Sequence, residues 1–407
     1  MPPNAAATPR PKGPGIGTEG LRPYKKTVSS SLAASDRFSY FHLLPNLKSW
    51  MPLGGKGFGP RRSAPHSTAG ASGLPRHVAV RYRPALMRAL LLLAALLSAP
   101  AVHAARITPG LEPGAHRVTV AGSGIAYHVA GSGPVVFVHP GGPGIEWTFV
   151  RMPRLEKFAT VVYIEPIGTG ASDRLSDPHG YTFERYVGDV EGIRAHLGIE
   201  KFVLLGHSHG GFVAQAYALA HPEHLRGLIL FDTSPTTGIE WQKDVASNLE
   251  WFRNEPWFQE ATDALAHETS AKTDEEITAI FKREMPLYFA EWSRRAKEYA
   301  PYRSSVRLTI APSKTSSDST APEQVGVASV FEVRDRLHSI STPTLVIVGK
   351  RDFVTSEKFG RMLHEGIQGS RLLLLQHSGH MGHLEEPEAF SQGIHDFLKT
   401  LPPQVPR

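Results

Sequence analysis

The 407-residue sequence contains no cysteine. This absence excludes disulfides, a thiol nucleophile, a lipidated N-terminal cysteine and any zinc or iron–sulfur site with cysteine ligands. Catalytic chemistry would therefore have to come from hydroxyl, imidazole and carboxylate groups. Hydrophobic residues make up 41% of the chain, which is enough for a sizeable core, so the chain as a whole is not disordered.

Acidic residues are nearly absent from the first 104 positions. This stretch holds 14 Lys or Arg but only Glu19 and Asp36, a net charge of +12, whereas the whole chain carries +6. The remaining 303 residues therefore carry −6. Because the basic excess belongs to the leader, the charge gives no argument for nucleic-acid binding, and we expect no nucleic-acid partner.

A hydrophobic run long enough to span a bilayer is also missing. The run at residues 89–102 has 14 residues, whereas a span needs roughly 20. Preceded by Met87 and Arg88 and followed by small residues, it predicts a signal peptide at 87–104 and a mature chain that begins near Ala105. We therefore expect a secreted or periplasmic protein without a stable membrane span.

Residues 1–86 precede this predicted signal peptide, although a signal peptide works only at an N-terminus. They contain 12 prolines and no sustained period of 2 or 3.6, so they predict a disordered leader that is not part of the mature protein. The simplest interpretation is that translation starts at Met87. An Arg- and Ser-rich targeting extension is the alternative, and the sequence leaves both open.

Short runs rich in Val and Ile alternate with helical stretches from residue 115 onward. Amphipathic helices are predicted at residues 183–198 and 212–222, each between two such runs. Strands that alternate with helices indicate βαβ units and a parallel sheet. The first two runs are joined by residues 122–124 and predict an antiparallel hairpin at the sheet edge.

Residues 236–335 differ in character, with tryptophans at positions that include 241, 251 and 257, several amphipathic stretches and few strand signals. The strand pattern returns at 342–349 and 370–376. We therefore predict an α/β fold, a mostly parallel sheet flanked by helices, with an inserted helical cap. The predicted parts are the leader at 1–86, the signal peptide at 87–104, a first core part at 105–235, the cap at 236–335 and a second core part at 336–407.

The sequence Gly-His-Ser-His-Gly-Gly at residues 206–211 lies between a predicted strand and a predicted helix. It matches G-x-S-x-G in the strand–turn–helix context that a nucleophile elbow requires. Glycines leave room where a Cβ would clash, and the serine is held in a strained conformation with its hydroxyl exposed. We therefore predict Ser208 as a nucleophile, against the alternative of an ordinary Gly/Ser turn.

A serine nucleophile needs a base, and the base needs an acid that orients it. Asp352 and His380 each follow a predicted strand, which is where a parallel sheet gathers its ligand groups. The chain order Ser208, Asp352, His380 is the one expected of this fold. One alternative acid and two alternative bases stay open: Asp232, His377 and His383.

The sequence His-Pro-Gly-Gly-Pro-Gly at residues 139–144 directly follows another predicted strand. Glycines here let the backbone turn so that an N–H can point at a developing oxyanion. We predict Gly142 as one donor of an oxyanion hole, with Gly141 as its alternative, and the N–H of His209 as the second donor. A purely structural turn is the competing interpretation.

Two groups of histidines have spacings that are plausible for metal ligands: His207 with His209, and His377 with His380 and His383. Zinc would need three or four ligands with carboxylates behind them. The nucleophile elbow already accounts for His207 and His209, and the loop after the predicted strand at 370–376, here called the base loop, accounts for the other three. We therefore expect no metal and no other cofactor.

With these motifs, residues 110–400 resemble the α/β-hydrolase superfamily and, within it, the proline-iminopeptidase-like group of serine hydrolases. That group carries H-G-G-P-G, G-x-S-x-G-G and then D-x-R-G-x-G-x-S. Here the first motif has an extra Pro140, and the third reads E-P-I-G-T-G-A-S at 165–172, without the Asp and the Arg. The group's cap motif of Arg, paired Glu and Trp, which holds a free N-terminus, is not recognisable. Three cap carboxylates are interpreted as solvated helix positions: Glu250, Glu255 and Glu291.

The function expected from the motifs and the resemblance is that of an exported serine hydrolase, which cleaves an ester, lactone or amide through an acyl-enzyme intermediate. The Trp residues of the cap and Phe252 would close an apolar pocket over Ser208, so the expected partner is a small-molecule substrate with an apolar portion. The alternatives are an iminopeptidase-like aminopeptidase, a C–C hydrolase or perhydrolase, and a ligand-binding protein on a hydrolase scaffold. Neither the substrate nor the oligomeric state follows from the sequence.

Overall fold

The computed structural model describes residues 109–312 and 330–403. The predicted leader at 1–86 and the predicted signal peptide at 87–104 lie outside the described residues, so both stay predictions. Within the described ranges, no helix combines the length and the apolar character that a membrane span requires.

Eight strands form one sheet in the order β1-β2-β4-β3-β5-β6-β7-β8. Their bounds are β1 Gly114–Val120, β2 Ser123–Gly131, β3 Val135–His139, β4 Thr160–Ile164, β5 Phe202–His207, β6 Leu225–Phe231, β7 Thr344–Gly349 and β8 Arg371–Leu375. The pairs β1–β2 and β2–β4 are antiparallel, and the other neighbours are parallel. The predicted α/β fold with a mostly parallel sheet is confirmed, as is the hairpin at its edge.

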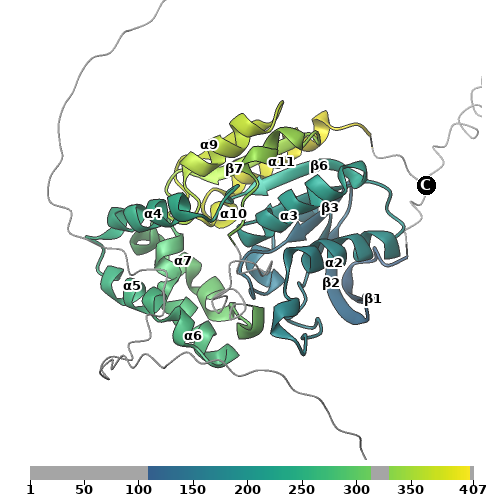
Figure 1. Cartoon of the computed structure of the whole chain (residues 1–407). Coiled ribbons are helices and arrows are strands. Elements are labelled where there is room, and N and C mark those ends of the chain that lie inside the picture. Colours follow the sequence, from purple (N-terminus) through teal and green to yellow (C-terminus); the bar gives the residue numbers. More distant parts are fainter. Residues whose placement is uncertain (1–108, 313–329, 404–407) are drawn as a thin grey trace, which may run out of the picture. The chain divides into compact units, whose positions relative to one another are not determined.

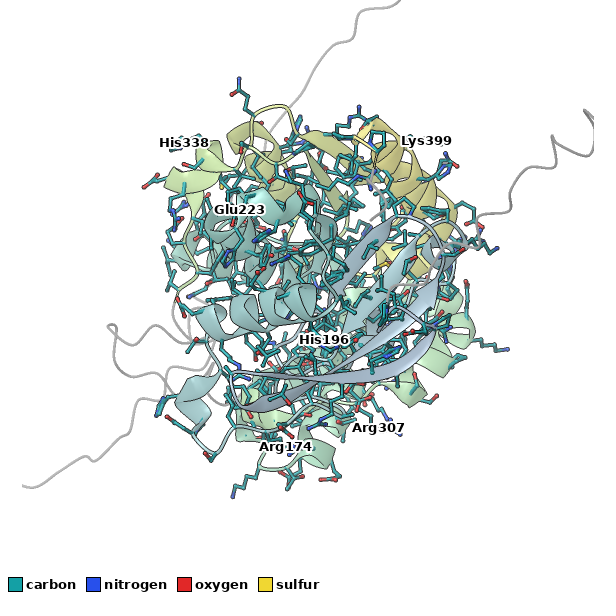
Figure 2. All side chains as sticks on the ribbon, turned by 90° about the vertical axis from the view of Figure 1, so that its right-hand side faces the viewer. Arg174, His196, Glu223, Arg307, His338 and Lys399 are labelled. Atoms are coloured by element: carbon teal, nitrogen blue, oxygen red, sulfur yellow. The ribbon has the colours of Figure 1, made fainter. Side chains whose placement is uncertain are left out.

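Helices cover both faces of this sheet (Figure 1). Their bounds are α2 Phe183–His196, α3 His209–Ala220, α9 Glu357–Gly366 and α11 Pro387–Thr400. Because successive strand residues point to opposite faces, Val162 and Leu204 pack with α2, α3 and α9, whereas Val161 and Leu205 pack with α11. Burial on both faces explains the unbroken apolar runs at residues 135–138 of β3 and 202–205 of β5. Charged side chains such as Arg174, Glu223 and Lys399 lie on the surface (Figure 2).

A group of helices is inserted between β6 and β7: α4 Ile239–Asn248, α5 Phe258–Ala266, α6 Asp274–Glu284 and α7 Trp292–Ser305. The chain leaves and re-enters the core at one place, where the N–H of Thr237 donates to the carbonyl of Phe331 at 2.9 Å. Figure 1 shows α4 to α7 gathered apart from the helices that cover the sheet. The insertion is helical, as the sequence predicts, while its limits at 236 and 335 stay predictions.

The cap packs onto the loops that follow the strands. Phe252 packs against Phe353, with ring centroids 6.5 Å apart, and so rests on the residue next to Asp352. A second buried cluster joins Phe281 of the cap to Phe149 of the core, at 5.7 Å. The expectation that the cap tryptophans line a closed pocket is wrong for Trp251, which is 42% exposed.

Candidate active site

Ser208 lies at the turn between β5 and α3 in a strained backbone conformation, with φ 54° and ψ −120°. Such a conformation costs of order 1–3 kcal/mol for a residue other than glycine and persists only where neighbours enforce it. Its N–H donates to the carbonyl of Phe231 at 3.0 Å. Its own carbonyl accepts the N–H of Gly211 and the hydroxyl of Thr233, both at 2.8 Å. These bonds fix the backbone and leave the serine hydroxyl outside the network.

The glycines of the elbow are required by close backbone approach. A Cβ on Gly206 would lie 2.2 Å from the carbonyl oxygen of Gly210, and a Cβ on Gly210 would lie 2.3 Å from that of His139. Only glycine lets the start of α3 pack this tightly against both β5 and the loop after β3. The elbow and the predicted oxyanion loop are therefore in direct contact.

His380 and Asp352 lie together, buried, at the ends of the loops after β8 and β7. The distance from His380 Nδ1 to Asp352 Oδ2 is 2.8 Å. Because a carboxylate only accepts, Nδ1 carries the proton, and Nε2 is left as the basic nitrogen. The alternative base His383 instead bonds the carbonyl of Phe149 through Nε2, at 3.2 Å.

Asp352 is held by several donors besides the imidazole. Its oxygens accept the hydroxyl of Thr355 at 2.6 Å, the N–H of Val354 at 2.8 Å and the N–H of Thr355 at 3.1 Å. Burial acts to raise the pKa of Asp352, but the imidazolium of His380 and these hydrogen bonds outweigh it and hold the pKa below its usual value. Asp352 is therefore ionised and able to orient His380.

The nucleophile and the base are brought together through His207, the residue before Ser208. His207 Nε2 lies 3.0 Å from the carbonyl oxygen of His380, and the two rings are 4.8 Å apart. The described residues show no hydrogen bond from the Ser208 hydroxyl to the His380 ring. In unliganded sites this bond is often long and tightens only when substrate binds.

The loop after β3 lies directly against Ser208. A Cβ on Gly141 would lie 3.0 Å from Ser208 Cβ, so this glycine touches the nucleophile. Gly142 has φ +115°, and a Cβ there would lie 2.7 Å from the nitrogen of Gly144. The geometry places Gly141 beside the serine, and the choice of Gly142 as the donor stays a prediction.

The imidazole of His209, the other predicted donor residue, is packed beneath the elbow. Its ring stacks on Phe183 at 5.5 Å and meets Tyr186 edge-on at 5.6 Å. Burial lowers the pKa of His209 to about 3 and, likewise, that of His139 to about 4. Both rings are therefore neutral near pH 7 and serve as packing groups, while the N–H of His209 is a separate, backbone feature.

Replacing His209 by Gln should weaken the pH dependence of stability. The folded pKa is lowered, so this imidazole stabilises the protein fully above the unfolded value of about 6.5 and loses about 1.4 kcal/mol per pH unit as pH falls toward about 3. The difference in unfolding free energy between the wild type and H209Q should therefore fall by about 2 kcal/mol between about pH 7.5 and pH 5. Urea unfolding at the two pH values measures this, and a constant difference would show that the ring titrates normally.

Glu165 explains the altered third motif. Its carboxylate accepts the N–H of Ala171 and contacts the ring of His128, and its carbonyl accepts the hydroxyl of Ser172 at 2.6 Å. Ser172 in turn accepts the N–H of Ala126 at 2.8 Å. The glutamate thus ties this turn to β2 without the Asp and the Arg of the related motif.

The base loop is fastened to the cap. The N–H of His380 donates to the carbonyl of Tyr288 at 2.8 Å, and the Tyr288 ring lies 5.7 Å from the His380 ring. Glu385 bridges the two segments, since its oxygens accept the N–H groups of Ala290 and Gly379, each at 2.7 Å. The cap and the base therefore share one hydrogen-bonded network.

Sequence reasoning missed a pair of cap carboxyls, Glu268 and Glu284. Glu284 is fully buried, and neither of its side-chain oxygens has a hydrogen-bond partner. Burial and the charge of Glu268 raise the pKa of Glu284 well above its usual value, and burial raises that of Glu268 to about 7. The signal in the sequence was the helical spacing, because Glu284 lies three residues after Phe281 and seven after Ile277, on the buried stripe of α6.

The predicted cap positions Glu250 and Glu291 are ordinary surface sites. Glu250 pairs with Arg253 at 2.5 Å and Glu291 with Arg294 at 2.7 Å, each three residues away. Glu255 accepts the hydroxyl of Ser293.

The two histidines of the elbow, His207 and His209, do not lie together as a pair of metal ligands would. His209 packs against Phe183, whereas His207 lies beside His380. The described residues do bring one different group together, since His207, Asp232 and His380 each offer an atom within 4.8 Å of the others. The His380 Nδ1 is already bonded to Asp352.

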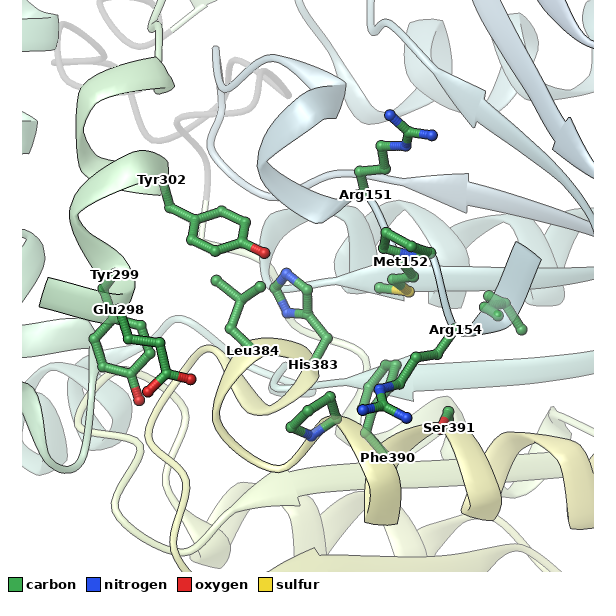
Figure 3. A pocket seen from close by; sticks show the side chains of 13 residues that line it. Arg151, Met152, Arg154, Glu298, Tyr299, Tyr302, His383, Leu384, Phe390 and Ser391 are labelled. Atoms are coloured by element: carbon green, nitrogen blue, oxygen red, sulfur yellow. The ribbon is translucent and has the colours of Figure 1, made fainter. Parts of the chain in front are cut away.

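A cavity of about 370 Å³ lies beside the base loop, between residues 151–155, α7 and the start of α11. Figure 3 shows Tyr302 pointing toward the ring of His383 across this space. Neither Ser208 nor His380 lines it. This cavity is therefore not the predicted apolar pocket over the nucleophile.

Comparison with known proteins places the chain in a family. Residues 134–387 match the model of the alpha/beta hydrolase fold, so the chain belongs to the α/β-hydrolase family and is an enzyme of that type. Within it, the chain is similar to proline iminopeptidase from Saccharolobus solfataricus, with 28% identity over 68% of this chain and 88% of that protein. It is also similar to 2-hydroxy-6-oxo-2,4-heptadienoate hydrolase from Pseudomonas putida, with 27% identity over 67% of this chain and 91% of that protein. A solved alpha/beta hydrolase from Bacillus anthracis, with 21% identity over 70% of this chain and 98% of that one and a TM-score of 0.57, shares the fold. The predicted resemblance to the proline-iminopeptidase-like group is confirmed.

Proposed function

We propose that the protein is an exported serine hydrolase that cleaves an ester, lactone or amide bond through an acyl-enzyme. The observation that carries this proposal is the 2.8 Å bond between His380 Nδ1 and Asp352 beside the strained elbow of Ser208. A buried, oriented imidazole next to a serine held at a strand–helix turn has the parts of a nucleophile, base and acid.

The proposed reaction assigns one role to each residue. The Ser208 hydroxyl attacks the substrate carbonyl while His380 Nε2 takes its proton, and Asp352 stabilises the imidazolium that forms. The N–H groups of Gly142 and His209 bind the oxyanion, each contributing about 2.7–4 kcal/mol in the transition state. His380 then gives the proton to the leaving group, and the same base activates water for deacylation.

A fluorophosphonate probe tests this function directly. The probe reacts with activated serines, so one adduct is expected, on the peptide that contains Ser208. A labelled serine elsewhere, or no label on a protein that turns over substrate, would contradict the proposal. N-terminal sequencing of the same protein from the extracellular or periplasmic fraction tests export, for which we expect a start near Ala105.

A second candidate function, an aminopeptidase that acts on a free N-terminus, is supported by Glu284 and Glu268. A buried carboxyl without a partner is unfavourable unless a proton or a cation satisfies it. Tyr288 packs on the base, with its ring 5.7 Å from the His380 ring, and burial and the charges of Glu284, Glu268 and Asp352 all raise its pKa. A substrate ammonium at Glu284 would therefore lie on the cap side of His380. The similarity of the chain to proteins named proline iminopeptidase also supports this candidate function.

A further inference from the structure

Asp232 is a buried acid with no role in the proposed reaction. It follows β6, the strand between β5 and β7, so it lies between the strand of Ser208 and the strand of Asp352. Its side chain is 0% exposed, and its backbone φ is 44°. A non-glycine residue in this left-handed region costs of order 1–3 kcal/mol and is kept only where the surroundings demand it.

The two carboxyl oxygens of Asp232 differ in their contacts. Oδ1 accepts the N–H of Gly349 at 2.8 Å, whereas Oδ2 is buried without a hydrogen-bond partner. An oxygen of Asp232 lies within 4.8 Å of a ring nitrogen of His380 and of one of His207. Because a hydrogen bond needs a separation of roughly 2.8 Å, a movement of about 2 Å would join Asp232 to His380.

Asp352 holds the imidazole in the native arrangement and keeps Asp232 uncharged. Burial raises the pKa of Asp232 well above its usual value, and the negative charge of Asp352 raises it further, with a smaller contribution from Glu385, while the backbone N–H groups of Gly349 and Gly382 act to lower it. Two buried carboxyls that repel each other in this way do not both ionise. Asp352, which has the donors, takes the charge, and Asp232 keeps its proton.

We propose that Asp232 is a reserve acid, a positioning residue that orients His380 when Asp352 is lost. This inference rests on the proposed function of Ser208 and His380. Without the charge of Asp352, Asp232 releases its proton to water, and its free oxygen accepts the hydrogen bond from His380 Nδ1–H. The O–H bond of Asp232 is the one covalent bond that breaks, its proton goes to water, and the His380 Nδ1–H only changes its hydrogen-bond acceptor.

Double substitution tests the reserve role through turnover of an activated ester. In a triad with no second acid, loss of the acid lowers kcat by about 10⁴. We expect D352A to lose only about 100-fold, because Asp232 takes over, and D352A/D232N to lose about another 100-fold. D232N alone should cost only a few-fold, about threefold at most, since Asn keeps the Oδ1 acceptor for Gly349.

The matched control is D352A/D189N. Asp189 is another buried acid, with a pKa that burial raises to about 7, but it pairs with Arg185 at 2.9 Å. D189N should not add to the loss in D352A. Equal rates for D352A and D352A/D232N, or a D352A rate already at the level of S208A, would overturn the reserve role. Full activity in S208A would instead overturn the proposed function. If D352A does not fold, the rates of D352N and D352N/D232N are compared instead, and they test the reserve role in the same way.

Discussion

Replacing Ser208 by Ala should lower kcat/KM on an activated ester at least about ten-thousandfold, while the protein stays folded. The hydroxyl is the only group lost, and the backbone bonds from Ser208 to Phe231, Gly211 and Thr233 do not involve it. The oxyanion donors and the base remain, so a residual rate above that of water is expected. Initial rates with p-nitrophenyl acetate, together with a thermal unfolding curve, measure both effects.

Ser172→Ala is the matched control for this substitution. Ser172 is buried, and its hydroxyl donates to the carbonyl of Glu165 and accepts the N–H of Ala126. S172A should therefore lose about 1–3 kcal/mol of stability and keep kcat/KM within about threefold. If S208A kept its rate, or if S172A lost as much, the serine at the elbow would not be the nucleophile.

The fold was predictable because its main signals are local. Unbroken apolar runs such as 202–205 can be buried on both faces, and only a parallel sheet covered by helices does this. The Gly-x-Ser-x-Gly turn is equally local, since the clashes at Gly206 and Gly210 come from residues near the turn or from the adjacent strand. The site residues from distant loops followed from strand order, because carboxyl ends of parallel strands meet at one edge.

The cap was less predictable because its partners are remote. Nothing in the sequence near Trp251 says that this ring faces solvent while Phe252 packs on Phe353. The alternative acids could not be separated either, since Asp232 and Asp352 both follow strands. Only the contacts decide, because Asp352 receives the donors of Thr355 and His380, whereas Asp232 keeps one oxygen unpartnered.

Replacing Glu284 by Gln should raise KM for a substrate with a free amine about 100-fold, if the second candidate function holds, with a smaller change in kcat. A buried carboxylate that pairs with an ammonium is worth about 2–5 kcal/mol, and Gln keeps the shape without the charge. Prolyl-p-nitroanilide and its N-acetylated form separate the effect of the amine from that of the acyl group. In the wild type, KM should be higher for the N-acetylated form than for the free amine. In E284Q, KM for the N-acetylated form should not change.

Low pH should weaken the binding of the free-amine substrate, because it protonates Glu268 and Glu284. Because the pKa of Glu268 is raised to about 7 and that of Glu284 lies well above its usual value, an arriving ammonium must displace a proton below these values. KM for the free amine should therefore fall as pH rises from about 6 to 8, and E284Q should flatten this slope. Glu255→Gln, a surface carboxyl bonded to Ser293, is the control and should change neither KM nor its slope. If E284Q slowed p-nitrophenyl acetate and the free amine equally, Glu284 would support the cap's packing, and the aminopeptidase candidate would be wrong.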